Sequence, residues 1–260
     1  MIYYLSCTGN TLWAARAISE AIQEPLINIA ALPDGEPLCA PQENERIGFC
    51  FPVHGWRPPV MVRAFVQRLR TVAAGKHYCW ALCTAGDDIG ETIDILADDL
   101  RHCGLTLDSA FSLQMPESYV GLPFMDTDPP DKEEKKKRQA AEDLHRYTEM
   151  ISQRLCGVRQ LHLSHWPRIN SRMLGAAFKR WLLTDRPFKV DKDRCTGCGR
   201  CASSCPAGNI AMTDHLPEWQ HNGCCLSCFA CYHHCPVRAI EYGHRTQHKG
   251  QYYFEKRTKH

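Results

Sequence analysis

The sequence predicts an α/β domain built on a parallel sheet with helices on both faces, followed by a small cysteine-rich α+β domain. In residues 1–156, short apolar segments alternate with helical stretches, and this alternation is typical of parallel sheets. From residue 187 onward, one string of cysteines occurs twice. Because the chain of 260 residues exceeds one domain of about 150, we expect domains at 1–156 and 187–260, joined by a connector with one helix at 157–186.

The elements of the first domain follow from the spacing of its apolar residues. Leu12, Ala15, Ile18 and Ile22 recur at helical intervals after a short apolar segment at 2–5. Further strands are expected at 26–29, 46–51, 76–84 and 105–115, and further helices at 58–70, 89–103 and 131–156. Ligands of such sheets bind at the carboxyl ends of the strands, where this chain has loops at 6–11, 52–59 and 84–90.

The loop at 6–11 reads Ser-Cys-Thr-Gly-Asn-Thr and comes directly before a predicted helix. Backbone N–H groups and the helix dipole favour a bound phosphate at such a position. A plain helix cap explains Asn10 or Thr11 equally well. The loop by itself therefore leaves both interpretations open.

Taken with the alternating strands and helices around it, this loop resembles the phosphate loop of the flavodoxins, and the resemblance covers residues 1–155. It implies a doubly wound sheet of strand order 2-1-3-4-5 and a bound FMN. The FMN phosphate would be held by Ser6, Thr8, Gly9, Asn10 and Thr11. The flavin ring would lie between two later loops, made of Pro52, Val53, His54, Gly55 and Trp56, and of Thr84, Ala85, Gly86 and Asp87.

Two side chains of the second loop are candidates for contact with the flavin ring. Trp56 could stack on it and His54 could hydrogen-bond its edge, but the first could equally be a surface aromatic and the second a plain loop histidine. The third loop lacks the aromatic residue that often stacks in flavodoxins, which would leave one flavin face open. An open face would suit a homodimer, in which a second copy covers it.

The cysteine string reads Cys-x2-Cys-x2-Cys-x3-Cys-Pro, first from Cys195 to Pro206 and again from Cys225 to Pro236. Thiolates at this spacing are typical of bacterial 4Fe–4S proteins, and the constant offset indicates two copies of one unit. Structural zinc would use two separated pairs, and a disulfide framework would need a secreted protein. Eight of the sixteen cysteines lie outside the strings; Cys224 is treated as a bystander and the others are expected to fill the core.

The C-terminal part therefore resembles the two-4Fe–4S ferredoxins, in which the fourth cysteine of each string ligates the other cluster. The resemblance implies two ligand sets: Cys195, Cys198, Cys201 and Cys235, and Cys225, Cys228, Cys231 and Cys205. Both parts together resemble the flavodoxin–ferredoxin fusion proteins of anaerobic bacteria and archaea. The Met-Pro-x-x-Tyr pattern of that group fits residues 115–119.

A fusion of this kind implies an electron-transfer oxidoreductase that relays single electrons between two 4Fe–4S clusters and FMN. It would serve a partner redox protein, such as a ferredoxin, a reductase or an oxidase. One alternative is a flavoenzyme that reduces a small organic substrate at an exposed flavin face, and another is a redox or oxygen sensor. The sequence holds no Gly-x-Gly-x-x-Gly fingerprint for NAD(P)H, and no catalytic residue is predicted.

Composition restricts the partners and the compartment. The net charge of +2 argues against a general role with nucleic acid or membranes. Because residues 1–5 lack the features of a signal peptide and no run of about 18 apolar residues occurs, we expect a cytoplasmic protein without a membrane span. An apolar stripe in the connector would either pack onto a domain or dock a partner; it comprises Met173, Leu174, Ala177, Phe178, Trp181 and Leu182.

Overall fold

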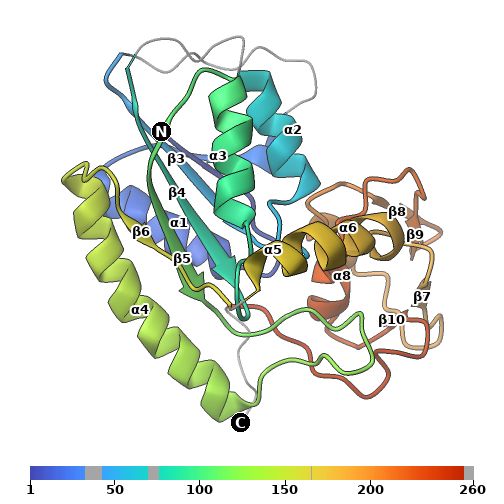
Figure 1. The fold of residues 1–260 in the computed structure, drawn as a ribbon. Helices are drawn as coiled ribbons and strands as arrows, with labels where there is room; N and C mark the ends of the chain where they lie inside the picture. The colour runs from blue at the N-terminus through green and yellow to red at the C-terminus, as the bar shows by residue number, and fades with distance from the viewer. Residues whose placement is uncertain (33–42, 70–75, 165, 255–260) are drawn as a thin grey trace.

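The computed structural model describes the 260 residues except 33–42, 70–75, 165 and 255–260. Its N-terminal part is a six-stranded sheet in the order β2-β1-β3-β4-β5-β6. Every neighbouring pair of strands in this sheet is parallel. The predicted order 2-1-3-4-5 is therefore confirmed, and β6 adds a strand at one edge (Figure 1).

The strands and helices of this part alternate along the chain as expected. The strands are β1 (Ile2–Tyr4), β2 (Leu26–Asn28), β3 (Arg46–Pro52), β4 (Tyr78–Ala85), β5 (Leu107–Gln114) and β6 (Arg159–Gln160). The helices are α1 (Asn10–Ile22), α2 (Val60–Leu69), α3 (Thr92–His102) and α4 (Pro130–Ser152), with a 3-10 turn at Ile29–Ala31. Residue 70, the expected end of α2, lies outside the described residues. Strand β6 and the 3-10 turn were not predicted, because both are too short to show a period.

Strand β4 divides the core into two layers. Ala81 and Cys83 belong to the cluster formed with α2 and α3, whereas Trp80 and Leu82 belong to the cluster formed with α1 and α4. Side chains alternate across a strand, so an uninterrupted apolar strand buries both faces of the sheet. Figure 1 shows α2 and α3 on one side of the sheet and α1 and α4 on the other.

The C-terminal part is built from two interlocked units. The short helices α7 (Arg200–Ser203) and α8 (Ala230–His233) occupy equivalent positions of the two cysteine strings, as do strands β8 (Ile210–Thr213) and β10 (Ile240–Tyr242). The strand before the first unit, β7 (Phe188–Val190), pairs antiparallel with β10, and the strand before the second unit, β9 (Leu216–Trp219), pairs with β8. The first strand of this part and the last thus close one sheet around both cysteine strings.

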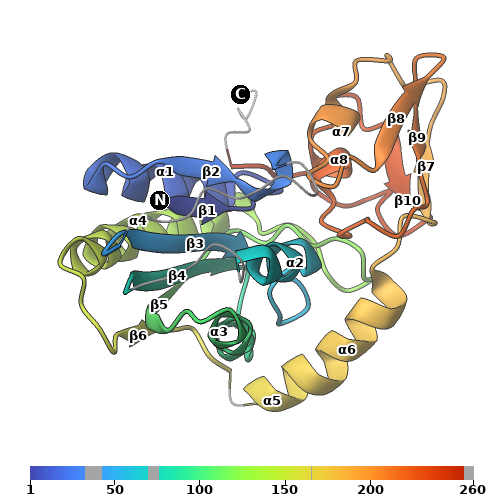
Figure 2. The same ribbon diagram turned by 90° about the horizontal axis from the view of Figure 1, so that it is seen from above.

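One continuous helical segment, the connector helix, runs between the two parts. It comprises α5 (Pro167–Ile169), a π-helical turn (Asn170–Leu174), α6 (Gly175–Ala177) and a second π-helical turn (Phe178–Leu182). Figure 2 shows it along the outer side of the molecule. Ser171 ties it to the sheet, because its Oγ donates to the Trp56 carbonyl at 2.8 Å and accepts from the Glu91 amide at 2.7 Å.

The end of the described chain returns to the first loop of the sheet. The Tyr252 hydroxyl donates to Asn10 Oδ1 at 2.6 Å, and the Phe254 amide donates to the Thr8 carbonyl at 2.8 Å. The Phe254 ring also stacks on Trp13, with 5.0 Å between ring centroids. Residues 252–254 therefore pack on the N-terminal part, although the sequence assigns them to the C-terminal domain.

Substitution of Gly48 tests the packing of the sheet. A Cβ atom at this position would lie 2.3 Å from Cζ2 of the fully buried Trp80. Gly48→Ala is therefore expected to lower the free energy of unfolding by about 1–3 kcal/mol through overpacking. Chemical denaturation followed by circular dichroism measures the change. In a Trp80→Phe background, which removes the clashing ring atoms, the loss should be smaller; an equal loss in both backgrounds would show that the contact is not the cause.

Candidate functional site

The loops after β1, β3 and β4 surround one cavity of about 630 Å³, which we call the loop cavity. Small-molecule sites commonly measure about 300–1,000 Å³. Every predicted flavin contact except Gly9 lines this cavity: Ser6, Thr8, Asn10, Thr11, Pro52, Val53, His54, Gly55, Trp56, Thr84, Ala85, Gly86 and Asp87. The three predicted loops therefore converge on one volume.

Gly9 instead shapes the first loop. Its φ of 91° is in the left-handed region, and a Cβ there would lie 3.0 Å from the Cβ of Phe254. The amides of residues 8–11 find no acceptor among the residues that the structure describes, and they precede or open the 13-residue helix α1. Unpaired N–H groups at a helix N-terminus fit an anion such as a phosphate.

The side chains of the first loop divide between structure and ligand. Asn10 accepts from Tyr252, and Thr11 Oγ1 lies 2.8 Å from Thr84 Oγ1. Both side chains therefore hold the loop to its neighbours. The groups left for a phosphate are the backbone amides together with the hydroxyls of Ser6 and Thr8, although Ser6 also accepts from the Leu12 amide at 3.2 Å.

The second loop holds Trp56 rigidly at the cavity wall. Trp56 has a φ of 57°, a left-handed conformation that costs about 1–2 kcal/mol for a residue with a side chain. Its indole Nε1 donates to Asp88 Oδ2 at 3.0 Å, and its carbonyl accepts from Ser171. These contacts from the third loop and the connector helix stabilise the strained turn.

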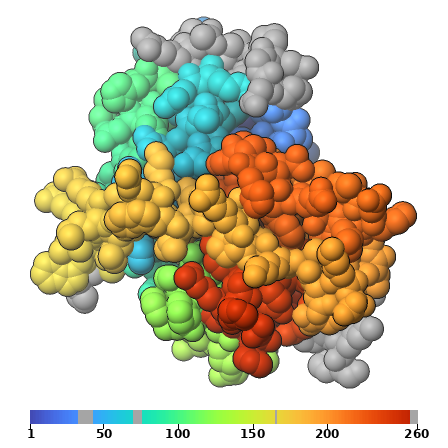
Figure 3. All heavy atoms as spheres, turned by 90° about the vertical axis from the view of Figure 1, so that its right-hand side faces the viewer, coloured from blue at the N-terminus to red at the C-terminus, as the bar shows by residue number. Residues whose placement is uncertain are grey.

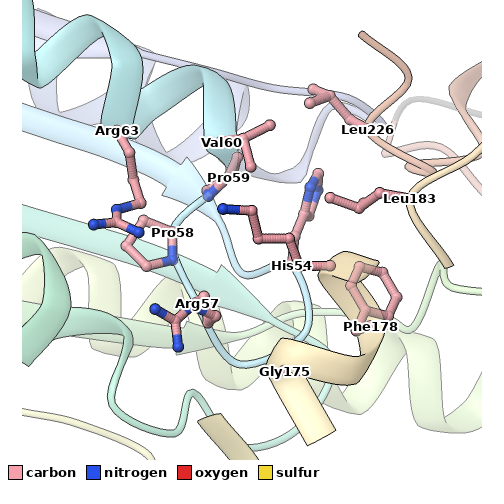
Figure 4. A pocket seen from close by; sticks show the side chains of 11 residues that line it. His54, Arg57, Pro58, Pro59, Val60, Arg63, Gly175, Phe178, Leu183 and Leu226 are labelled. Carbon is pink, nitrogen blue, oxygen red and sulfur yellow. The ribbon is translucent and has the colours of Figure 1, made fainter. Parts of the chain in front are cut away.

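His54 lies between the loop cavity and a smaller hollow beneath the connector helix. Figure 4 shows its ring near Val60, Leu183 and Leu226. Burial lowers the pKa of His54 to about 4, because an imidazolium loses its hydration in apolar surroundings. His54 is therefore neutral near pH 7 and would meet a ligand as an uncharged group.

The third loop is clamped by residues that the sequence analysis did not single out. A Cβ on Gly86 would lie 2.2 Å from Glu117 Oε2, and Lys136 Nζ donates to the Gly86 carbonyl at 2.7 Å and to Asp128 Oδ2 at 2.6 Å. Burial raises the pKa of Glu117, against the opposing effect of the Tyr119 and Ser118 amides that it accepts from. The Met-Pro-x-x-Tyr pattern at 115–119 was the one sequence signal near this group.

The eight cysteines of the two strings separate into two groups of four. One hollow is lined by the outer group, Cys195, Cys198, Cys201 and Cys235. A second hollow is lined by the inner group, Cys205, Cys225, Cys228 and Cys231. The fourth cysteine of each string thus lies with the first three of the other, the arrangement of two-cluster ferredoxins. In the described part of the chain, no three His, Cys, Asp or Glu side chains converge on a single-ion site.

Backbone amides point at the sulfurs in both units. The Asn209 amide donates to Cys205 Sγ at 3.4 Å, and at the equivalent place the Ala239 amide donates to Cys235 Sγ at 3.2 Å. The Ser227 amide likewise donates to Cys225 Sγ at 3.4 Å. Such hydrogen bonds stabilise thiolates and tune the potential of a cluster, so both hollows fit 4Fe–4S clusters in donor chemistry as well as arrangement.

The inner group and the loop cavity share a wall. Ser227 and Cys228 line the loop cavity, and Cys228 also lines the inner hollow. From the first loop, the Cys7 thiol donates a hydrogen bond to Cys228, which lowers the pKa of Cys228 and raises that of Cys7. Sequence reasoning treated Cys7 as a core residue, because no sequence pattern links two positions so far apart.

Comparisons with known proteins agree with this geometry. A family model described as a 4Fe–4S binding domain matches residues 187–210. The chain is 38% identical over 58 residues to the pyruvate synthase subunit PorD of Methanothermobacter marburgensis, which is 22% of this chain and 65% of PorD. It is 45% identical over 47 residues to one subunit of the ion-translocating oxidoreductase complex of Methanosarcina acetivorans, 18% of this chain and 17% of that protein.

Together with the strand order, these matches decide the architecture. The chain is a flavodoxin-like fold fused to a ferredoxin-type 4Fe–4S segment. It covers less than two thirds of the length of either curated relative. Among solved structures, rubredoxin oxygen:oxidoreductase from Desulfovibrio gigas aligns with a TM-score of 0.35 and 15% identity over 57% of this chain and 35% of that one, too distant a likeness to carry an argument. Within the described residues of this fusion chain, no helix has the length and apolar character needed to cross a membrane.

The lowered pKa of His54 predicts a pH-dependent stability. The unfolded chain binds a proton on this histidine below about pH 6.5, whereas the folded chain does so only below about pH 4. Stability is therefore lost as the pH falls from about 6.5 to 4, by at most about 3 kcal/mol. Unfolding of the wild type and of His54→Gln, compared between pH 5 and 7.5, should show a shallower slope in the variant.

The matched control for this experiment is His145→Gln, because the His145 side chain is 77% exposed. It should keep the slope of the wild type. Equal slopes for wild type and His54→Gln would contradict the burial of a neutral imidazole.

Proposed function

We propose that the protein is an electron-transfer module that relays single electrons between two 4Fe–4S clusters, in the outer and inner groups, and FMN in the loop cavity. One observation carries the proposal: Cys228 lines both the inner hollow and the loop cavity. A cluster ligated by Cys228 would therefore border the FMN site directly. Bound FMN supplies exchange between two-electron and one-electron chemistry, and the clusters supply one-electron transfer.

The protein's own groups divide this work. The free amides of residues 8–11 would bind the phosphate, and the clamped loops with Trp56 and Gly86 would position the ring. Eight thiolates and the amides directed at them would hold the clusters. Because Asn10 and Thr11 are held by neighbouring elements, the phosphate loop is fixed before a ligand arrives, which lowers the entropic cost of binding.

The outer group supports a route to a partner protein. Cys198 is exposed, whereas Cys231 of the inner group is buried. A one-electron partner could thus approach the outer cluster while the inner one stays within the protein. Both relatives carry the names of redox-complex subunits, which supports a redox protein as the partner of this chain.

A second function is favoured by the extent of the loop cavity. Beyond the three flavin loops its wall includes Phe124, Met125 and Asp126, and the Phe124 side chain is 83% exposed. This rim leaves a place for a small organic substrate next to the flavin. The two functions differ in one reaction: the enzyme would be reoxidised by a small acceptor alone, whereas the carrier would need its protein partner.

Anaerobic purification followed by iron, sulfide and flavin assays tests the proposal. Two 4Fe–4S clusters correspond to about eight irons per chain, and one FMN per chain is expected after incubation with FMN. Eight irons without flavin would contradict the relay. Flavin without iron would contradict the cluster assignment.

The crosswise ligand sets predict which cluster each cysteine holds. Cys235→Ala should remove the cluster of the outer group, lowering iron from about eight to about four per chain, and leave the inner cluster and FMN in place. Iron analysis and electron paramagnetic resonance measure this. Cys224→Ala is the control, since Cys224 is exposed and lines neither hollow. Full iron in Cys235→Ala would show that the sets are wrong.

A further inference from the structure

The outward side of the connector helix carries apolar side chains that the fold does not use. Of the ten large hydrophobic residues that are exposed in the described chain, five lie within 166–181. We call them the outer face: Trp166, Ile169, Met173, Leu174 and Trp181, which are 67%, 45%, 68%, 49% and 68% exposed. Single exposed apolar residues are ordinary, but a contiguous group marks a binding surface.

The packing of the connector helix depends on its opposite side. Gly175 is buried, and a Cβ there would lie 2.5 Å from the Gly55 carbonyl. Ser171 makes the hydrogen bonds to the second and third loops, and Phe178 lines the loop cavity. The predicted apolar stripe is thus divided: Phe178 faces the protein, while Met173 and Trp181 face solvent. Figure 3 shows the helix, in gold, lying across the surface.

The charges around the outer face all have one sign. Residues 166–184 contain four basic side chains and no Asp or Glu: Arg168, Arg172, Lys179 and Arg180. Three of them are exposed or half-exposed without an ion pair in the described chain, whereas Arg172 pairs with Glu91 at 2.9 Å. In a symmetric dimer the same patch meets itself, so two copies would bring basic groups together. The charge therefore selects an anionic occupant rather than a second copy.

The shape of the outer face favours a lipid surface among anionic occupants. The side chains stand on the convex side of a helix, with tryptophans near both ends, and this combination of tryptophan, aliphatic and basic residues is typical of helices that lie in the membrane interface. We propose that the outer face docks the protein peripherally on membranes rich in anionic lipid. The whole-chain charge of +2 conceals this local excess of positive charge.

Docking in this way would orient the loop cavity. Phe178 reaches the cavity from the same helix whose outer face would contact lipid. The flavin site would then lie about one helix diameter, about 10–12 Å, from the lipid headgroups. The attraction would weaken with salt, because exposed charges are screened.

Vesicle binding tests the proposal on the purified holoprotein under anaerobic conditions. Vesicles of equal parts phosphatidylglycerol and phosphatidylcholine should sediment at least tenfold more protein than vesicles of phosphatidylcholine alone, with a blue shift of tryptophan emission. The double variant Met173→Glu/Trp181→Glu and the charge variant Lys179→Glu/Arg180→Glu should each lose this binding about tenfold. The matched control is Leu155→Glu, at a residue 40% exposed outside the connector helix, and it should bind like the wild type.

Several results would overturn the proposal. These are no binding to anionic vesicles, equal binding to neutral vesicles, or wild-type binding by both variants with intact iron content. A dimer in solution that Met173→Glu/Trp181→Glu abolishes, without lipid binding by the wild type, would identify a second copy as the occupant. Because iron content reports folding separately, a misfolded variant is recognised and the other variant still decides.

Discussion

The relation between the two cofactor sites depends on one buried ammonium group. Lys249 is 8% exposed, and its Nζ donates to the carbonyls of Val120, Leu122 and Met125. Burial lowers its pKa while Asp126 opposes the change, and the three carbonyls replace the water that a buried charge loses. Since these carbonyls belong to the loop after β5 and Lys249 follows the cysteine strings, this contact holds the cluster region against the wall of the loop cavity.

The two cysteine units share a backbone rather than a set of residues. Gly197, Gly199 and Gly208 have φ of 66°, 71° and 57°, and the equivalent positions Ser227, Phe229 and Arg238 have 47°, 59° and 51°. Residues with side chains are strained in this conformation, so their presence needs a compensating contact. Ser227 accepts from the Thr184 amide at 3.0 Å and donates to the Leu182 carbonyl at 2.6 Å, and Phe229 packs among aromatic rings. The second unit thus exchanges backbone ease for attachment to the rest of the protein.

The sequence predicted what local patterns encode. Alternating apolar segments indicated the strands, and the spacing of the cysteines indicated the two strings whose crosswise grouping the hollows display. It could not predict Cys7 against Cys228, Glu117 over Gly86 or the return of Phe254 to Gly9, because these contacts join distant positions without a period or motif. The apolar stripe of the connector was visible, but its division between packing and exposure depends on which side meets Gly55, and that is a tertiary property.

The fusion changes what a redox partner must recognise. In two separate proteins, both the cluster surface and the flavin surface would have to be complementary for each encounter, whereas a shared chain makes that encounter intramolecular. Here Cys7 and Cys228 already meet, and Ser227 closes the same wall, so the inner contact needs no docking surface. In the proposed relay, partner selection would then rest on the exposed surroundings of Cys198 and on the rim of the loop cavity. Those two surfaces are where substitutions could change the partner without disturbing the internal route.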